Sequence, residues 1–227
     1  MPIGYEINDL AKEESWRIFR FMGEMVEGFD RLSGVEPAVT VYGSARVSPE
    51  DELYQQAYMI ARRLGELGFS IITGGGPGLM EAANKGAREA GVVSVGLNIQ
   101  LPQEQSANPF STLSMTFKHF FIRKVMLVKY ATAFIIMPGG LGTLDELTEV
   151  LTLMQTLKIK PFPVVLFGTT FWKGFLEWLR NTVLPPGYIS EEDFNKLRVS
   201  DDPDEVVEAV QKWYIRQEVV GQKALRQ

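Results

Sequence analysis

The sequence predicts an α/β protein built on one doubly wound parallel sheet with helices on both faces. Short apolar runs, typical of buried parallel strands, alternate along the chain with segments of helical periodicity. Such alternation indicates right-handed βαβ crossovers. Glycine-rich turns join three of the strands to the segments that follow them. Because these turns all lie at the carboxyl edge of a parallel sheet, we expect them to converge on one pocket.

The first half of the chain predicts three helices and four strands. An amphipathic helix is expected from about Asp9 to Leu32, and its apolar face would pack on the core or a partner. The residues on that face are Trp16, Phe19, Met22, Val26 and Phe29. The pattern then predicts a strand at 38–42, a helix near 49–67, a strand at Ser70, a helix from Leu79, and strands at 92–97 and 113–117.

The second half continues the alternation. It predicts a helix at 120–130, a strand ending at Met137, a helix from Leu144, a strand at 162–167, and helices at 172–183 and 203 to about 218. No internal linker or low-complexity segment interrupts the chain. With 227 residues and 45% hydrophobic content, the chain can bury one sizeable core. We therefore expect a single domain at 36–227, preceded by an N-terminal helical extension at 1–35.

Composition excludes several classes of function. The net charge is −5 and no block of Lys or Arg stands out, so a nucleic-acid polymer is not an expected partner. Cysteine is absent, and His119 is the only histidine, which removes thiolate nucleophiles, Ser-His-Asp triads and multi-histidine metal sites. No apolar run approaches the roughly 20 residues of a membrane span, and the first residues do not read as a signal peptide. We expect a cytoplasmic protein without a membrane partner.

The most informative turn is the run from Pro138 to Thr143, which contains Gly139, Gly140 and Gly142. These glycines let a ligand approach backbone N–H groups at the start of the following helix, which is electropositive and suits a phosphate. Two similar turns follow earlier strands. They are Thr73-Gly74-Gly75-Gly76-Pro77-Gly78 and, with fewer glycines, Gly43-Ser44-Ala45-Arg46.

These turns do not match the common nucleotide motifs. None has the third glycine of the dinucleotide fingerprint Gly-x-Gly-x-x-Gly, and no glycine is followed directly by lysine as a P-loop requires. NAD, FAD and P-loop ATP hydrolysis are therefore disfavoured. We expect a small phosphorylated ligand and no cofactor or metal.

Taken together, the turn from Gly74 to Met80, the pair Arg123-Lys124 and the stretch from Pro138 to Glu146 resemble the Lonely Guy (LOG) family. That family was formerly labelled "possible lysine decarboxylase". Its motif Pro-Gly-Gly-x-Gly-Thr-x-x-Glu is complete here, and the spacing matches over roughly 39–167. The resemblance implies a Rossmann-like homodimer that hydrolyses a nucleoside 5′-monophosphate, AMP or a cytokinin riboside 5′-monophosphate, to free base and ribose 5-phosphate.

The resemblance also assigns residues. Its catalytic pair falls on Arg123 and Glu146. The residues expected near the nucleotide are Glu104, Lys124, Gly139, Gly140, Gly142, Thr143 and Thr152. This chain departs from the shorter family members in having Phe120-Phe121 where they have Met-His one residue ahead of the Arg-Lys pair, and Glu81 in place of a glycine. Both differences bear on base preference.

The assigned chemistry is physically coherent, but each residue also has a structural reading. Cleaving a glycosidic bond builds positive charge on the ribose, which a fixed carboxylate such as Glu146 stabilises. Arg123 offers a planar donor fork that suits a phosphate or a ribose oxygen. Alternatively, Thr143 and Glu146 form a capping box, Arg123 and Lys124 are a solvated pair, and Glu81 is a first-turn acid.

Two other functions stay open at this point. A nucleotide-binding carrier or regulator would use the same turns without turnover. A decarboxylase would need a lysine that forms a Schiff base with pyridoxal phosphate, and no feature of the sequence indicates such a lysine.

Overall fold

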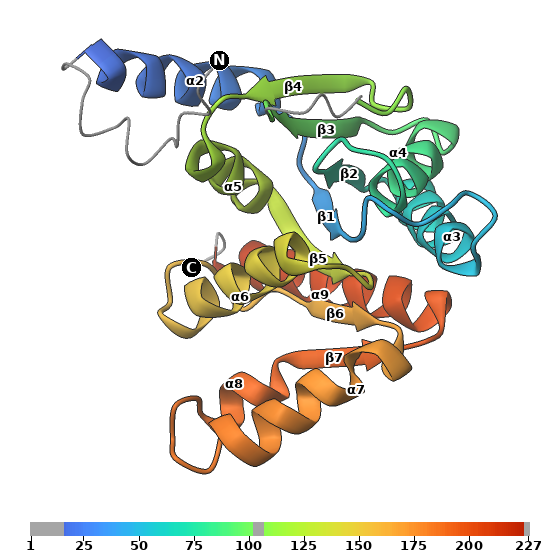
Figure 1. Cartoon of the computed structure of the whole chain (residues 1–227), viewed down its shortest axis with the longest axis vertical. Helices are drawn as coiled ribbons and strands as arrows, with labels where there is room; N and C mark the ends of the chain where they lie inside the picture. Colours follow the sequence, from blue (N-terminus) through green and yellow to red (C-terminus); the bar gives the residue numbers. More distant parts are fainter. Residues whose placement is uncertain (1–15, 102–106, 225–227) are drawn as a thin grey trace.

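The computed structural model describes residues 16–101 and 107–224. Within them lies one seven-stranded, all-parallel sheet in the order β4-β3-β2-β1-β5-β6-β7 (Figure 1). The strands are β1 (Ala38–Tyr42), β2 (Ser70–Thr73), β3 (Ser94–Ile99), β4 (Leu113–Phe117), β5 (Ala131–Ile136), β6 (Val164–Phe167) and β7 (Leu197–Ser200). The predicted α/β fold with a doubly wound sheet is confirmed.

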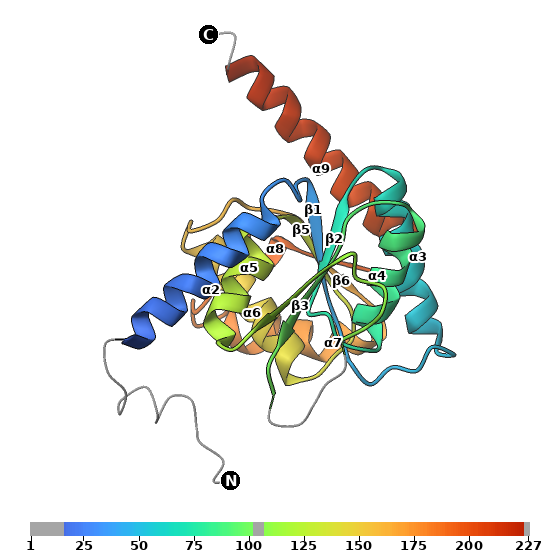
Figure 2. The same ribbon diagram turned by 90° about the horizontal axis from the view of Figure 1, so that it is seen from above.

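Helices cover both faces of the sheet (Figure 2). One face packs against α2 (Trp16–Leu32), α5 (Phe120–Lys129), α6 (Leu141–Gln155) and α7 (Thr169–Trp178). The other packs against α3 (Glu52–Glu66), α4 (Leu79–Glu89) and α9 (Pro203–Ala224). Each face has its own apolar cluster, as expected for a central parallel sheet that is buried on both sides. The C-terminal end of α9 projects from the body of the domain (Figure 2).

The strand order reverses between β1 and β5. From β1 the chain builds outward through β2 and β3 to β4, then returns to lay β5 along the other side of β1. Tyr42 at the end of β1 is level with Ile136 at the end of β5. The two turns that follow these strands therefore flank the switch point, which is where open α/β sheets bind ligands.

The N-terminal helix α2 packs on α5, but not through the predicted face. Phe21, Met25 and Leu32 contact the core, and Gly28 sits against Met126, where a Cβ atom would be 2.7 Å from Cε. The predicted face lies outward instead, with exposed fractions of 63% for Phe19, 54% for Met22, 56% for Val26 and 36% for Phe29. Of the two surfaces predicted for this stripe, the structure excludes the core, and packing on a partner stays a prediction. Helical periodicity identified an apolar stripe but not what covers it.

Four other elements, β7, α8, α7 and α6, differ from the prediction. The final strand β7 and the short helix α8 (Glu191–Asn195) were not predicted. Strand β7 alternates apolar and polar residues over four positions, without the apolar run that marks the equally short β2 and β6, and the five residues of α8 are too few to show helical periodicity. The helix expected at 172–183 is α7 from Thr169, followed by a π-helical turn, η1 (Leu179–Val183). Helix α6 begins at Leu141, so part of the glycine run is already helical. In the described part of the chain, no helix is long and apolar enough to cross a membrane.

Candidate functional site

Hydrogen bonds join the three predicted turns at the carboxyl edge of the sheet. The Ser44 N–H, after β1, donates to the Pro138 carbonyl after β5 at 3.1 Å. The Ser44 carbonyl accepts from the N–H of Leu79, where α4 begins after β2, at 3.0 Å. As expected, the turns converge on one region. Gly43 fits there because a Cβ atom would be 2.9 Å from Leu79 Cβ.

The turns open onto a cavity of about 720 Å³. It is lined by Gly43, Ser44, Ala45, Arg46, Met80, Phe120, Arg123, Lys124, Gly140, Leu141, Gly142, Thr143, Asp145 and Glu146. Eight of these are predicted site residues: Gly43, Ser44, Arg123, Lys124, Gly140, Gly142, Thr143 and Glu146. Arg46, Met80 and Phe120 also line the cavity. The sequence analysis named all three in its turns and motifs but did not assign them to the site.

The N-terminus of α6 forms one wall of the cavity. Its N-cap is Gly140, which has no side chain to accept from the first-turn N–H groups. Thr143 is the third residue of the helix and is buried, so the predicted Thr143–Glu146 capping box is wrong. A Cβ atom at Gly139 would overlap the Thr143 side chain, which explains that glycine. The first turn of α6 is left open to an anion.

Glu146 and Arg123 face each other across the cavity from α6 and α5. Glu146 Oε1 lies 3.5 Å from Arg123 Nη2, and their side chains are only 16% and 11% exposed. Burial raises the pKa of Glu146 to about 7, since the opposing charges of Arg123 and Lys124 offset only part of that effect. A carboxyl group that titrates near neutral pH is suited to proton transfer. Arg123 Nε is buried and donates to no described partner, so this donor is unused.

The glycines after β2 act mainly through packing. A Cβ atom at Gly74 would lie 2.5 Å from Arg123 Nη2, so the missing side chain makes room for the guanidinium. Gly75 has φ +73°, and its carbonyl accepts from the Asn108 N–H at 2.9 Å. The Gly76 carbonyl accepts from Asn108 Nδ2 at 3.0 Å. Gly75 and Gly76 thus frame the site without lining the cavity.

A buried polar network holds that turn in place. Asn84 accepts from Thr73 Oγ1 at 2.6 Å and from Asn108 Nδ2 at 2.9 Å, and it donates to Ser94 Oγ at 2.8 Å. Thr73, Asn84 and Ser94 are fully buried. A network with satisfied donors and acceptors in a low-dielectric interior fixes a single arrangement.

Lys124 lines the cavity but is already paired. Its Nζ lies 3.0 Å from Asp145 Oδ2 and 3.4 Å from Glu149 Oε2, both on α6. Burial acts to lower the pKa of Lys124, but the hydrogen bond with Asp145 and the charge of Glu149 outweigh it, and the pKa is raised. Lys124 therefore stays charged and ties α5 to α6.

One predicted residue of the described chain, Thr152, lies away from this cavity. Thr152 is exposed on α6, and its hydroxyl donates to the Thr148 carbonyl at 2.7 Å. It lines a separate hollow of about 170 Å³ with residues of α7 such as Trp178. Glu104 lies outside the described residues. Among the remaining predictions, Pro138 and Gly139 support the turn without lining the cavity.

Two further polar residues near the site have structural contacts. Glu81, in the first turn of α4, accepts from the Tyr54 hydroxyl at 3.0 Å. His119 precedes α5, and its Nδ1 lies 3.2 Å from Glu24 of α2. Both contacts join neighbouring elements. No group of three or more His, Cys, Asp or Glu in residues 16–101 and 107–224 is arranged to hold a metal ion.

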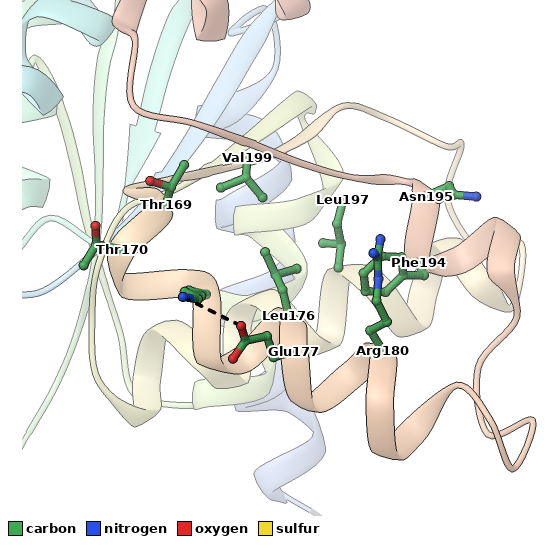
Figure 3. A pocket seen from close by; sticks show the side chains of 10 residues that line it. Thr169, Thr170, Leu176, Glu177, Arg180, Phe194, Asn195, Leu197 and Val199 are labelled. Atoms are coloured by element: carbon green, nitrogen blue, oxygen red, sulfur yellow. Dashed lines mark ion pairs between the residues drawn. The ribbon is translucent and has the colours of Figure 1, made fainter.

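A second cavity, of about 590 Å³, lies between α7 and β7 (Figure 3). Leu176, Leu197 and Val199 line it, together with the ion pair of Lys173 and Glu177. Arg180 stacks over Phe194 at 4.9 Å from the ring centroid. This second cavity is lined by no predicted site residue, and the charged side chains Lys173, Glu177 and Arg180 that line it have the partners just described.

Comparison with known proteins shows the family of this chain. The family model described as "Possible lysine decarboxylase" matches residues 80–210. A cytokinin riboside 5′-monophosphate phosphoribohydrolase of Mycobacterium marinum is 30% identical over 174 residues, which cover 75% of this chain and 91% of that protein. The chain belongs to the LOG family.

A second relative is similar over a shorter region. The LOG phosphoribohydrolase of Oryza sativa subsp. japonica is 33% identical to this LOG-family protein over 144 residues. The match covers 61% of this chain and 58% of the rice protein, so the chain spans little more than half the length of that relative.

Solved structures share the fold. The crystal structure of TM1055 has a TM-score of 0.59 and 25% identity, with 77% of this chain and 98% of that chain covered. The molybdenum cofactor carrier protein of Chlamydomonas reinhardtii has a TM-score of 0.57 and 21% identity, with 79% and 98% covered. At that identity, the likeness to the carrier protein concerns the fold alone.

Proposed function

We propose that this LOG-family protein hydrolyses the N-glycosidic bond of nucleoside 5′-monophosphates, AMP or a cytokinin riboside 5′-monophosphate, to free base and ribose 5-phosphate. One observation carries the proposal. The buried Glu146 carboxyl, with its pKa raised to about 7 by burial, faces Arg123 in the cavity that contains the open N-terminus of α6. The names of the M. marinum and rice relatives support this class of substrate.

The cavity suits each part of such a substrate. Its volume of about 720 Å³ lies within the range of roughly 300–1,000 Å³ usual for small-molecule sites. The 5′-phosphate binds the N–H groups at the start of α6, around Gly140 and Gly142. The ribose then lies toward Glu146. Phe120 and Met80 give the base an apolar wall.

The chemical step follows from this placement. As the bond between ribose and base breaks, its electron pair leaves with the base and positive charge builds on the ribose. Ionised Glu146 stabilises that charge and accepts a proton from the water whose oxygen bonds to the ribose. The same proton then neutralises the departing base. Arg123 cannot serve as a base, so its part is to hold the carboxylate and orient substrate oxygens.

The test is to incubate the protein with a panel of nucleoside monophosphates and measure free base and ribose 5-phosphate. Glu146→Gln keeps the shape of the side chain but removes the charge and the site for the proton. We expect it to lower kcat by at least about a hundredfold while AMP still binds. Glu208→Gln, at an exposed position on α9, is the matched control and should keep full activity. Equal turnover by Glu146→Gln would refute the assigned role.

A non-catalytic carrier is the second candidate. Solved molybdenum cofactor binding and carrier proteins share the fold, and a carrier would use the same turns to hold a phosphorylated ligand. It predicts that AMP binds but is recovered unchanged after long incubation. The raised pKa of Glu146 favours the enzyme, because a carrier has no need for a carboxyl that titrates near neutrality.

The older decarboxylase label finds less support. A lysine that forms a Schiff base must lose its proton, which requires a lowered pKa. Lys124 is the lysine that lines the cavity, and its pKa is raised by Asp145 and Glu149 in spite of its burial.

We also propose that two copies of the chain pair through the outward stripe of α2. This stripe, defined as Phe19, Met22, Val26 and Phe29, is exposed. Beside it on α5, Phe120 and Phe121 are each 47% exposed and Val125 is 39% exposed. Exposed apolar side chains gathered on two helices that pack together are typical of a protein interface. Because Phe120 also lines the cavity, the second copy would close over the rim of the site.

A further inference from the structure

The cationic side chains of the cavity differ in what they already bind. Arg46, Arg123 and Lys124 line it. Arg123 faces Glu146, and Lys124 is shared by Asp145 and Glu149. Arg46 is exposed, and in the part of the chain that the structure describes no carboxylate lies within ion-pair distance of it. Its charge is therefore available to a ligand.

The backbone around Arg46 is fixed beside the anion-binding turn. The Arg46 N–H donates to Ser44 Oγ at 3.1 Å, which closes a tight turn after β1. The Ser44 N–H in turn donates to the Pro138 carbonyl at the start of the glycine run. Arg46 is thus two residues from a direct contact with that run, and it lines the same cavity as Gly140, Gly142 and Thr143.

We propose that Arg46 is the residue that binds the 5′-phosphate by its charge and so distinguishes a nucleoside monophosphate from a nucleoside. Lys124 then serves to position α5 against α6. The ligand in this inference, a nucleoside 5′-monophosphate, is taken from the proposed function. The α6 N-terminus alone offers partial charge, whereas a phosphate dianion needs a full counter-charge. An arginine fork gives two parallel hydrogen bonds to phosphate oxygens.

The experiment measures the Kd of AMP, adenosine and ribose 5-phosphate by calorimetry for the full chain and four substitutions, Arg46→Ala, Arg46→Lys, Lys124→Gln and Arg216→Ala. For the titrations, all are made in the Glu146→Gln background, so that AMP is not consumed. Arg46→Ala should weaken binding of AMP and ribose 5-phosphate by roughly tenfold to a hundredfold, as expected for losing a charge-assisted contact. Adenosine binding should change by less than about twofold. Arg46→Lys should be intermediate. Arg216→Ala, an exposed arginine on the far half of α9, removes the same charge and should change nothing.

Kinetics and stability separate binding from structure. Arg46→Ala should raise the KM for AMP at unchanged kcat, with no change in Tm, because the phosphate is bound alike in ground and transition states. The proposal is overturned if Arg46→Ala binds AMP like the wild type, or if adenosine loses as much affinity as AMP. It is also overturned if Lys124→Gln alone shows the phosphate-specific loss.

The two proposals fail in different ways. If AMP is never hydrolysed but its binding depends on Arg46, the enzymatic function fails and the role of Arg46 stands. If AMP is hydrolysed and Arg46→Ala keeps the wild-type KM, only the role of Arg46 fails. If neither AMP nor ribose 5-phosphate binds the wild type, both are wrong.

Discussion

The folded protein destabilises the ionised form of the Glu146 side chain. Burial of the carboxyl raises its pKa, and the neighbouring Asp145 and Glu149 add to that rise, while Arg123 and Lys124 oppose it. In the unfolded chain the same carboxyl titrates near 4.5. Between these two pKa values the folded state binds a proton that the unfolded state has released. Stability therefore falls as pH rises from about 4.5 to about 7.

We expect Glu146→Gln to be more stable than the wild type above neutral pH. The neutral amide of Gln removes the cost of burying a charged carboxylate. At pH ~8 the free energy of unfolding of the variant should therefore be higher by on the order of 1–3 kcal/mol. At pH ~4 the gain should vanish, because Glu146 is then protonated in both states. Urea unfolding at the two pH values measures the difference. A variant that is no more stable at the higher pH would show that Arg123 compensates the charge fully.

At the level of single residues, the motif led to Arg123 and Glu146, which the fold does bring together. Local sequence patterns failed where a residue's role depends on contacts with residues far away in the sequence. The Thr-x-x-Glu pattern indicated a cap, but the helix begins earlier, at Leu141, and Thr143 lies inside it. Arg46 was given no role from the sequence. The carboxylates of α6 pair with Arg123 and Lys124 and not with Arg46, and this pairing follows from the fold.

At the level of elements, the three turns work because backbone packs closely against side chains. Gly74 has an ordinary φ, so its role is the space it leaves for Arg123 and Met80. The turn after β5 places α6 so that its first N–H groups open into the cavity. The network around Asn84 supports the turn after β2 from below. The site is thus built by contacts between turns more than by any one of them.

A Cβ atom at Gly74 should disturb the site more than the fold. We expect Gly74→Ala to push Arg123 away from Glu146, to lower kcat for AMP by about tenfold or more, and to cost about 1–3 kcal/mol of stability through overpacking. Gly174→Ala on α7 is the control, since a Cβ atom there meets nothing within 4 Å and should stabilise the helix slightly. Steady-state kinetics and thermal unfolding of both variants would check this. Full activity in Gly74→Ala would mean that the position of Arg123 is not critical.

The elements themselves were predictable to different degrees. Strands β1 and β5 were found because they are continuous apolar runs of five or six residues. Strand β7 has four residues and no continuous apolar run. Helix α8 has five residues and begins with a capping box at Ser190 and Asp193. The sequence of α2 shows two apolar faces, Phe21-Met25-Leu32 and the outward stripe. Periodicity cannot decide which of them meets the sheet.

At the level of the whole molecule, exposed apolar side chains concentrate on the face formed by α2, α5, α6 and α7. On the opposite face, among α3, α4 and α9, few large apolar side chains are exposed within the described residues; Leu67, Ile215 and Val219 are the examples. Helix α2, which carries the outward stripe, and helix α5, which carries the exposed aromatic residues, pack on each other and lie side by side in both views (Figures 1 and 2). This asymmetry suits a molecule that pairs through one face.

We expect Met22→Asp combined with Val26→Asp to convert a dimer into a monomer. Both side chains are more than half exposed, so the charges should not unfold the single chain. Burying two carboxylates between copies, however, should oppose pairing strongly. Sedimentation velocity measures the mass in solution, and Ile215→Asp on the opposite face is the matched control. A wild-type monomer, or a dimer that survives the double substitution, would contradict the proposed interface.

The overall topology was the most predictable feature, because alternation of strand and helix leaves few ways to wind a parallel sheet. The reversal between β1 and β5 has a wider consequence. It creates a recess between the ends of β1 and β5 through chain connectivity alone. The apolar clusters on the two faces of the sheet stabilise the fold, so the loops around the recess are not needed for stability. A fold of this kind can change its ligand through a few substitutions in its loops. Relatives with this architecture should therefore diverge in chemistry sooner than in shape.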